Sequence, residues 1–461
     1  MKFFLALLLG VFALLWPALS IHIVPHSNGS LPLRTSYDFI VIGAGIGGLV
    51  VANRLSEDAS VTVLVVEARD LDDRAEDVTV PGNVGQENPS RYEWTMTTTP
   101  QEFLDNRTRS FAQGRAVGGS SIMNGLCWTR GSAADYDAWR NLGNPGWGWS
   151  DLLPYFLKSE NYTTHADASL HLSPTHSKHG RQGPVQVGYP RYVYNQTYNF
   201  LDGVQALGIP LNEDLNSGYA TGASLVPSSV TAENQSRADA RAALDVDVLV
   251  HLPGVGSNLQ DHTMVQPVYK YTAPAVFTAL DIVGDTREAV KAEYFANRTV
   301  EHLPPTYDVT LRAGYAAQQA EIRALLSRRD VSAYELMVTS WGQLAVSVMH
   351  TLSRGTVHAR SSSIFDNEPP ILDLRLCSHA FDCEILRMGL EFNDRLINTD
   401  GTAAMMPRHA GGVVDTGLRV YGTRNLRVVD ASIMPLIPGG HIQSAIYAIA
   451  EKAADIIKQD N

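Results

Sequence analysis

The residues with the clearest chemical meaning are four glycines that lie within six positions, from Gly43 to Gly48. Gly43 permits a tight turn, Gly45 lets the backbone approach a pyrophosphate, and Gly48 lets a following helix pack closely on a sheet. The free N–H groups and the positive dipole end at the start of such a helix favour phosphate. The run therefore predicts a dinucleotide-binding turn whose contacts are Gly43, Ala44, Gly45, Gly47 and Gly48.

The elements expected around this turn agree with that interpretation. Residues 37–42 are apolar and predict a strand, residues 49–55 have a helical pattern, and residues 61–66 predict a second strand. Glu67 ends the second strand, where its carboxylate can accept both hydroxyls of an adenosine ribose and would repel a 2′-phosphate, which argues against NADP. The alternative is a glycine-rich strand–helix turn that holds no ligand.

A second run of small residues, Gly118-Gly119-Ser120-Ser121, presents free backbone N–H groups. Such a run suits a second phosphate or the edge of a flavin, and the alternative is an ordinary surface loop. Near the C-terminus, apolar residues at helical spacing predict a helix over residues 443–458. His441 lies just before that helix, whose dipole would keep the imidazole neutral, so His441 is a candidate general base.

The composition limits the classes of partner. The chain has 461 residues, of which 44% are hydrophobic and 18% charged, so it can form a large core and two domains. Its formal net charge of -12 disfavours nucleic acid and anionic membrane surfaces. The three cysteines, at 127, 377 and 383, contain no CxxC pair, so no metal site is expected. Cys377 and Cys383 are close enough to pair in an oxidising compartment, but their spacing is equally compatible with free thiols.

The N-terminus has the features of a secretory signal peptide over residues 1–20. Lys2 supplies the positive start, and the apolar stretch from Phe3 to Leu15 is too short to span a bilayer comfortably. The alternative is a membrane anchor. We expect a secreted protein that has no membrane contact after signal removal and that carries N-glycans. The N-glycosylation sequons start at Asn28, Asn106, Asn161, Asn195, Asn234 and Asn297.

Four blocks of the sequence resemble the glucose–methanol–choline (GMC) oxidoreductases, a family of FAD-dependent alcohol oxidases and dehydrogenases, and especially its secreted fungal members. These blocks are residues 37–70, 114–147, 252–262 and 401–461. The resemblance implies an α/β fold with a Rossmann-like FAD-binding domain and an α+β substrate domain that has an antiparallel sheet. The FAD-binding domain would comprise residues 35–145, 245–262 and 401–461, and the substrate-binding domain residues 146–244 and 263–400.

The resemblance also implies which residues contact FAD. Met123 stands where some relatives carry the His that attaches FAD covalently, so non-covalent FAD is expected. Besides the first turn and Glu67, the implied cofactor residues are Arg115, Gly118, Gly119, Ser120, Ser121, Asn124 and Gly125 in the second block, and Asp430, Ala431, His441, Ile442 and Gln443 in the fourth.

The activity implied by the resemblance is oxidation of a small-molecule alcohol at a CH–OH group. His441 would remove the hydroxyl proton while hydride passes to flavin N5, and oxygen or another acceptor would reoxidise the flavin. Alcohols of secondary metabolism or lignin-derived aromatic alcohols are the expected substrates. Asn398 occupies the position of the family's main catalytic His, three residues before Gly401, and an amide cannot accept a proton at neutral pH.

The chain departs from the family by being short. Residues 236–244 and the stretch from Val246 resemble the two ends of a longer family segment, here joined through Asp245 alone, and the segment before Asn398 is also short. Loss of strands exposes sheet edges and removes core area. A catalytically impaired remnant or an incomplete gene model is therefore the alternative. A lyase on the same scaffold is a further one, whereas an NAD-dependent dehydrogenase gives no role to the second and fourth blocks.

Overall fold

The computed structural model describes most of the FAD-motif regions and part of the remaining chain. The described residues are 36–68, 76–83, 92–165, 178–193, 209–233, 236–238, 250–251, 309–338, 344–358, 370–391, 414–419, 427–436, 438–440 and 442–459, with residues 34, 172, 197, 198, 201, 202, 205 and 360. The expected signal peptide, the third block, Asp245, Asn398 and His441 lie outside the described residues.

A parallel strand–helix–strand unit forms at the first block, as predicted. Strand β1 (Phe39–Ile42) leads into helix α2 (Ile46–Leu55), and β2 (Val63–Glu67) returns alongside β1 in parallel register. Helix α2 begins three residues earlier than its apolar pattern predicts. Its second and third residues are Gly47 and Gly48, whose lack of side chains hid the helix from a reading of apolar spacing.

The three-stranded sheet of this unit has the order β1-β2-β7, where β7 (Val250–His251) pairs in parallel with β2. Strand β1 is therefore an end strand among the described residues. Its side chains Ile40 and Ile42 are 60% and 62% exposed, although strands of parallel sheets normally have both faces covered. Ile40 and Ile42 therefore form an exposed apolar face of the described sheet, while the predicted gap at Asp245 lies outside the described residues.

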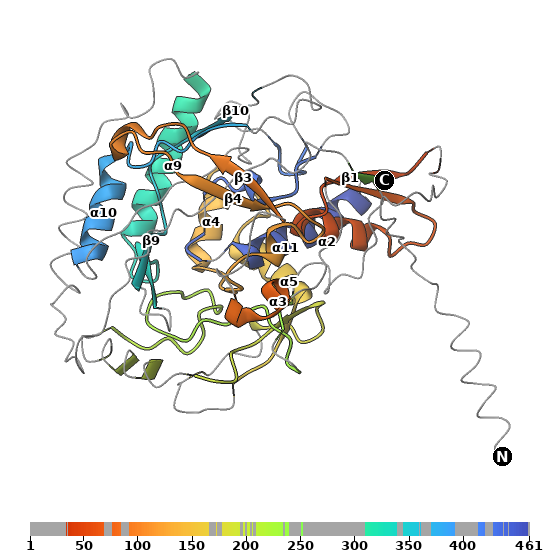
Figure 1. Cartoon of the computed structure of the whole chain (residues 1–461), viewed down its shortest axis with the longest axis horizontal. Coiled ribbons are helices and arrows are strands. Elements are labelled where there is room, and N and C mark those ends of the chain that lie inside the picture. Colours follow the sequence, from red (N-terminus) through yellow and green to blue (C-terminus); the bar gives the residue numbers. More distant parts are fainter. Residues whose placement is uncertain are drawn as a thin grey trace.

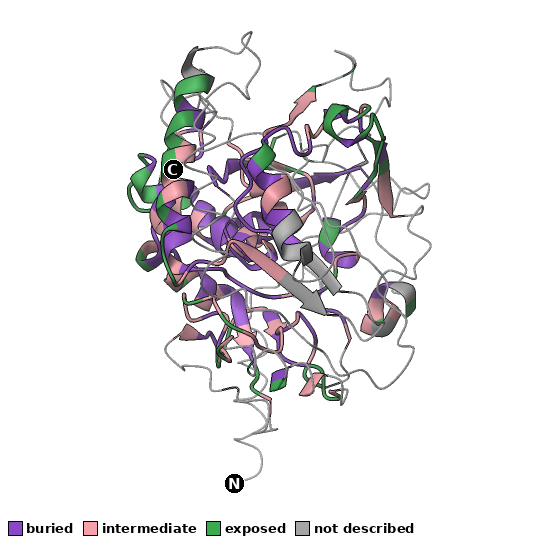
Figure 2. Cartoon of the chain, turned by 90° about the vertical axis from the view of Figure 1, so that its left-hand side faces the viewer, coloured by how far each residue is buried: buried purple, intermediate pink, exposed green. Residues whose placement is uncertain are grey.

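The C-terminal helix α11 (Gln443–Gln459) lies against α2 and α5 (Trp149–Ser159), and its observed end is one residue past the predicted one. Most residues of α2 and α11 are buried, and in Figure 2 the buried segments, in purple, lie toward the inside of the molecule. Arg54 of α2 donates two hydrogen bonds to the fully buried carboxylate of Glu451, at 2.6 Å each. This bidentate pair joins the first block to the fourth block, across 397 positions of the sequence.

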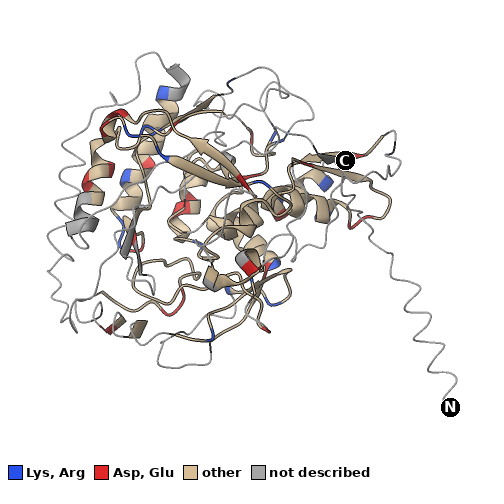
Figure 3. Ribbon diagram, in the orientation of Figure 1, with Lys and Arg blue, Asp and Glu red and all other residues tan. Residues whose placement is uncertain are grey.

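The remaining elements form hairpins and helices around that centre. In Figure 1, α9, β9 and α10 lie on the side opposite α2 and β1, with α4 between them. Basic and acidic residues are interspersed over the described part of the chain (Figure 3). The helices are α3 (Glu76–Thr79), α4 (Ala133–Asn141), α9 (Val309–Leu326) and α10 (Ala380–Glu391), with short 3-10 turns η1 (Pro81–Asn83), η3 (Glu102–Leu104), η4 (Gly119–Ile122) and η9 (Ala431–Ile433).

Among the described strands, three consecutive pairs form antiparallel hairpins, and β5 (Glu160–Tyr162) pairs with β6 (Val185–Val187) in parallel. Two hairpins, β8 (Tyr334–Val338) with β9 (Leu344–Val348) and β10 (Thr356–His358) with β11 (Ile371–Asp373), lie in the region expected to hold an antiparallel sheet. The third, β3 (Glu93–Thr97) with β4 (Ser110–Gly114), lies between the first block and the second, where no element is predicted from the sequence. Its alternating side chains Met96 and Phe111 pack with Leu372.

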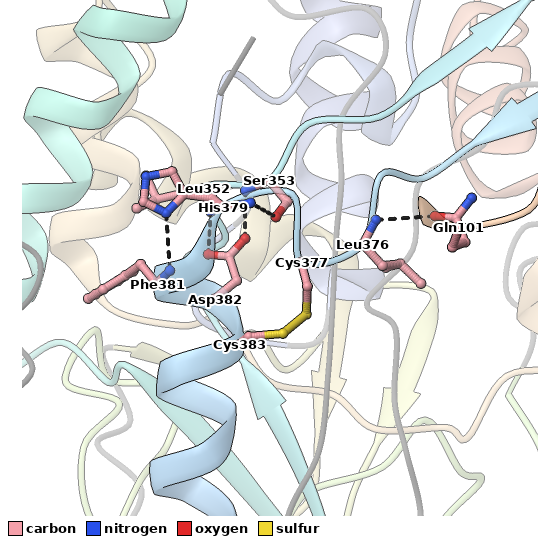
Figure 4. The surroundings of a disulfide bond; sticks show 9 residues. All are labelled: Gln101, Leu352, Ser353, Leu376, Cys377, His379, Phe381, Asp382 and Cys383. Carbon is pink, nitrogen blue, oxygen red and sulfur yellow. Dashed lines mark hydrogen bonds between the residues drawn. A yellow bond between two sulfur atoms is a disulfide. The ribbon is translucent and has the colours of Figure 1, made fainter. Parts of the chain in front are cut away.

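A disulfide joins Cys377 to Cys383, which resolves the pairing that the sequence left open. Cys377 precedes α10, whereas Cys383 lies within it, next to the buried carboxylate of Asp382, which accepts hydrogen bonds from the backbone N–H groups of Leu352 and Ser353 at 2.7 and 2.6 Å (Figure 4). Burial raises the pKa of Asp382, and these hydrogen bonds oppose that rise. The cross-linked segment is thereby tied to the loop after β9.

A buried charge cluster joins the second block, through Trp128 and Arg130, to three later segments. Glu160 accepts hydrogen bonds from Arg130, from a ring nitrogen of His179, and from the indole N–H of Trp128. The other ring nitrogen of His179 faces Asp214 at 3.1 Å. Burial would lower the pKa of His179, but the two carboxylates raise it above its ordinary value. Burial would likewise raise the pKa of Glu160, but Arg130 and His179 hold it below its ordinary value.

This cluster predicts a pH-dependent contribution of His179 to stability. A raised folded-state pKa means that the contribution is complete below the unfolded value of 6.5 and disappears as pH rises through the folded value. We expect the difference in unfolding free energy between the wild type and His179→Gln to shrink from about pH 6 to about pH 9. Urea unfolding at a series of pH values measures it, and a difference that grows with pH would contradict the assignment.

Candidate functional site

The glycine turn has the geometry expected of a phosphate-binding helix start. Gly43 has a φ of 95°, a left-handed value that favours glycine, and its N–H donates to the carbonyl of Val66 at 2.7 Å. Gly45 is the N-cap of α2 and has an extended backbone with no side-chain cap. The first N–H groups of α2 therefore donate no hydrogen bond to the side chain of the N-cap residue. This end of the helix is suited to binding an anion.

The second block packs backbone to backbone against the first. The N–H of Gly118 donates to the carbonyl of Ala44 at 2.8 Å, and a Cβ on Gly119 would lie only 2.8 Å from Cα of Gly45. Gly118 and Gly119 also have positive φ values, 104° and 55°. The hydroxyl of Ser121 donates to the carbonyl of Gly118, so this turn is held by its own side chain.

The fourth block reaches the same place from the C-terminal part of the chain. A Cβ on Gly47 would lie 2.1 Å from the carbonyl oxygen of Val429, so only glycine fits at that crossing. Asp430 and Ala431, predicted to bind the cofactor, follow Val429 directly and therefore lie beside the start of α2. The three predicted segments, far apart in sequence, converge on one helix N-terminus.

Glu67 lies where β2 ends beside the glycine turn, and its side chain is buried. Its two carboxylate oxygens accept hydrogen bonds from the N–H groups of Ala44 and Ala68, each at 2.8 Å. A carboxylate oxygen can accept more than one hydrogen bond, so these contacts orient Glu67 and are compatible with its predicted ribose contact. The negative charge opposes a phosphate at that position.

A hydrogen-bonded chain links the second block to α11. The side-chain amide of Asn124 donates to Gln443 at 2.9 Å, while its carbonyl oxygen accepts from Arg237 at 2.8 Å. Arg237 is 1% exposed and also donates to the carbonyls of Ser121 and Val78. The sequence did not single out Arg237 as a site residue. Its position in the family-like stretch 236–244 was the available signal.

The turn before α11 is fixed by the second block and α4. The indole of Trp139 donates to the carbonyl of Leu436 at 2.8 Å, and the N–H of Gly439 donates to Asp135 at 2.8 Å. A Cβ on Gly440 would lie 2.5 Å from the backbone nitrogen of Gly131, so these two segments touch through backbone atoms. Ile442, the last residue before α11, packs at the edge of the main core.

These features fit FAD as the group that the site holds. The described blocks supply a bare helix start, backbone N–H groups without intervening side chains, and a carboxylate at the end of β2. A Cβ on Gly125 would meet no atom of the described residues within 4 Å, so this part of the structure leaves the backbone beside Asn124 open to a ligand. The guanidinium carbon of Arg115 lies 3.9 Å from the centre of the Trp94 ring, and this contact fixes the side chain of Arg115 at the start of the second block.

The structure thus brings together the described members of the predicted cofactor set. These are Gly43, Ala44, Gly45, Gly47, Gly48, Glu67, Arg115, Gly118, Gly119, Ser120, Ser121, Asn124, Gly125, Asp430, Ala431, Ile442 and Gln443. The two predicted catalytic residues, His441 and Asn398, lie outside the described residues. Within the described ranges, no three His, Cys, Asp or Glu side chains are grouped to hold a metal ion. None of the helices described there is long and apolar enough to cross a membrane.

Comparisons with known proteins match both halves of the cofactor region. Models of the GMC oxidoreductase family match residues 37–250 and 397–450. Glucose oxidase-like protein fsoC of Humicola fuscoatra is 30% identical, over 92% of this chain and 95% of that protein. Dehydrogenase xptC of Emericella nidulans is 27% identical, over 93% and 94%.

Solved structures share the fold. An FAD-dependent oxidoreductase from Chaetomium thermophilum superposes with a TM-score of 0.82 at 26% identity, covering 92% of this chain and 99% of that one. A fungal aryl-alcohol oxidase gives 0.76 at 24% identity, covering 93% and 100%, which shows the α/β fold.

The sequence alignment with the Humicola protein is 564 positions long, whereas this chain has 461 residues, so that relative contains segments with no counterpart here. The family models nevertheless cover more than half of the chain, and the Humicola protein matches nearly all of it. The chain belongs to the GMC oxidoreductases, and its cofactor is FAD, which this family usually binds non-covalently.

Proposed function

We propose that this protein is an FAD-dependent alcohol oxidoreductase that converts a CH–OH group into a carbonyl. The observation that carries the proposal is the convergence of Gly45, Gly119 and Val429 on the start of α2, since this backbone cradle has no other evident use. Bound FAD would supply the hydride acceptor for the alcohol carbon. The chain's own residues must hold the alcohol and take its proton.

The cofactor residues divide the task by position. The amides at the start of α2 and in the turn at Gly118–Gly119 would hold the diphosphate, with Asp430 and Ala431 beside them. Glu67 would orient the adenosine ribose. Asn124 and Gln443, joined by their 2.9 Å hydrogen bond, would line the flavin side, and Met123 offers no nitrogen for covalent attachment.

His441 is the proposed base, because it lies two positions before Gln443, the first residue of α11. A helix N-terminus disfavours the imidazolium ion, so the ring would stay able to accept the hydroxyl proton. Asn398 would hydrogen-bond the alcohol and orient it, without accepting the proton. The products are then the carbonyl compound, reduced FAD and a protonated His441.

The substrate class rests on the relatives. Their printed names include a glucose oxidase-like protein and an oxygen-dependent choline dehydrogenase from Stenotrophomonas maltophilia, 27% identical to this chain. Both names denote oxidation of small alcohols, and the second names oxygen as an acceptor. We extend to this chain a small-molecule alcohol, with oxygen or another acceptor, and include alcohols of secondary metabolism and lignin-derived aromatic alcohols as candidates.

Secretion and the division into domains remain part of the proposal. The apolar N-terminus suggests a signal peptide at residues 1–20, and the disulfide suits an oxidising compartment. Of the sequons, Asn106 lies in an exposed turn and Asn161 in strand β5. We retain residues 35–145, 245–262 and 401–461 as the FAD-binding domain and the intervening segments as the substrate-binding domain.

A catalytically impaired remnant is the second candidate. Asn398 in place of a His and the exposed face of β1 at Ile40 and Ile42 favour it. The two candidates differ in whether an alcohol reduces the bound flavin.

The visible spectrum of the purified protein tests the first requirement. We expect the purified protein to show flavin absorbance, and we expect the flavin to be released on denaturation in acid because the FAD is non-covalent. Under anaerobic conditions, the absorbance of the bound flavin should bleach when a suitable alcohol is added from a panel of sugars, choline-type alcohols and aromatic alcohols. Flavin that stays oxidised with every member of the panel would favour the remnant. If the protein holds no flavin even after reconstitution with FAD, both the active flavoenzyme and a remnant that still binds FAD would be rejected.

Gly125→Ala tests the location of the cofactor. The added methyl group meets no atom of the described residues within 4 Å, so the thermal midpoint without FAD should stay at the wild-type value. If FAD occupies that space, overpacking should weaken binding about 10-fold, which corresponds to about 1.4 kcal/mol. Fluorescence titration of the apoprotein with FAD measures the dissociation constant. Unchanged affinity would move the flavin away from Gly125.

His441→Asn tests the base. The variant keeps a hydrogen-bonding side chain but cannot accept a proton, so flavin reduction by alcohol should slow about 10²- to 10⁴-fold while the flavin spectrum persists. Stopped-flow reduction at saturating alcohol measures the rate. His358→Asn, on the exposed end of β10, is the matched control and should reduce at the wild-type rate. Equal rates for both variants would remove His441 from the mechanism.

A further inference from the structure

A buried pair, Asp135 and His350, lies against the turn that leads into α11. The side chains of both residues are 1% exposed, and Nε2 of His350 lies 2.9 Å from Oδ1 of Asp135. The other carboxylate oxygen of Asp135 accepts from the N–H of Gly439 at 2.8 Å and from that of Ser132 at 2.9 Å. One carboxylate therefore joins the second block, the loop after β9 and the turn before α11.

The backbones of Gly439 and Gly131 pack closely against the carboxylate of Asp135. A Cβ on Gly439 would lie 3.2 Å from Oδ2 of Asp135 and 3.3 Å from Cε1 of His350. A Cβ on Gly131 would lie 3.0 Å from the same carboxylate oxygen. The glycines at both positions let the turn approach the buried pair, so the pair determines where the backbone of Gly439 can lie.

His350 is itself held from two sides. Its Nδ1 lies 3.1 Å from the carbonyl oxygen of Ser332, while its Nε2 faces Asp135. Leu352 and Ser353, two and three residues after His350, donate their backbone N–H groups to the carboxylate of Asp382 (Figure 4). The imidazole is thereby fixed on the hairpin β8–β9 and cannot turn away from Asp135 without losing a buried hydrogen bond.

We propose that Asp135 and His350 are positioning residues that fix the Gly439–Gly440 turn, the described backbone that immediately precedes His441 in the sequence. The relevance of this turn to catalysis rests on the proposed role of His441. The contact also couples the substrate-side hairpin β8–β9 to the FAD-side helix α11, since His350 follows β9 and Gly439 precedes α11. Neither residue needs to touch alcohol or flavin.

Hydrogen exchange of the full-length protein tests the positioning directly. In His350→Ala, the amides of the peptide spanning residues 436–444 should exchange at least about 10-fold faster, because the buried carboxylate that holds Gly439 has lost its other partner. The peptide covering α2 should keep its wild-type rate. His350→Gln, which retains a donor toward Asp135, should restore most of the protection.

His179→Gln is the matched control, because it also removes a buried imidazole that contacts carboxylates, Glu160 and Asp214, but does not touch Gly439. It should leave exchange of residues 436–444 at the wild-type rate. Equal acceleration in the His179 and His350 variants, or acceleration in every peptide, would mean general loosening and would overturn the proposal. If His350→Ala does not fold, Asp135→Asn decides, since it keeps an acceptor for Gly439 but weakens the contact with His350.

Flavin reduction supplies the second readout. Positioning predicts that His350→Ala lowers the limiting reduction rate about 10-fold or more with little change in the FAD dissociation constant, and that His350→Gln recovers it. A wild-type reduction rate in His350→Ala with faster exchange at residues 436–444 would overturn the catalytic part. If no alcohol reduces the wild-type flavin, the proposed function fails, whereas the exchange measurement still decides whether the pair fixes the turn.

Discussion

The site depends on close approach of backbones at three crossings where a side chain would not fit. Gly119 crosses Gly45, Gly47 crosses Val429, and Gly440 crosses Gly131. A Cβ at Gly47 would lie 2.1 Å from a carbonyl oxygen, far inside any tolerated contact. The first two crossings bring three sequence segments to the start of α2, where backbone N–H groups can face a phosphate only when no side chains separate them, and the third joins the second block to the turn before α11.

Buried carboxylates then hold these segments in place. Glu451 pairs with Arg54 between α11 and α2, Asp135 joins α4 to the turn before α11, and Glu160 gathers Arg130 and His179. Each carboxylate is nearly inaccessible to solvent and is hydrogen-bonded, as a buried charge must be. Removal of one partner leaves a buried charge uncompensated, so these contacts specify the relative positions of segments that hydrophobic packing alone would leave adjustable.

The chain keeps this centre although it is shorter than its 564-position alignment with the Humicola relative. The Humicola relative, which aligns with this chain over nearly the full length of both proteins, contains segments that have no counterpart here. In the described part of the sheet β1 lies at one end, and its Ile40 and Ile42 side chains are largely exposed. The cradle for FAD is formed by helix starts and turns rather than by the outer strands, which explains how the motifs can remain together while the sheet is small.

The sequence by itself determined the local elements and the identity of the cofactor. The glycine spacing, the strand–helix–strand pattern around it and Glu67 follow from short-range geometry, so β1, α2, β2 and α11 were predictable to within a few residues. The hairpin β3–β4 was not, because its alternating pattern is short and its apolar face is explained only by Leu372, more than 250 positions away. The pairing of Cys377 with Cys383 was likewise open until the backbone brought the two residues together. Arg237, His350 and the contact of Asp135 with Gly439 were decided only by the tertiary structure, because their partners are distant in sequence and no local spacing encodes a contact between buried groups on separate segments.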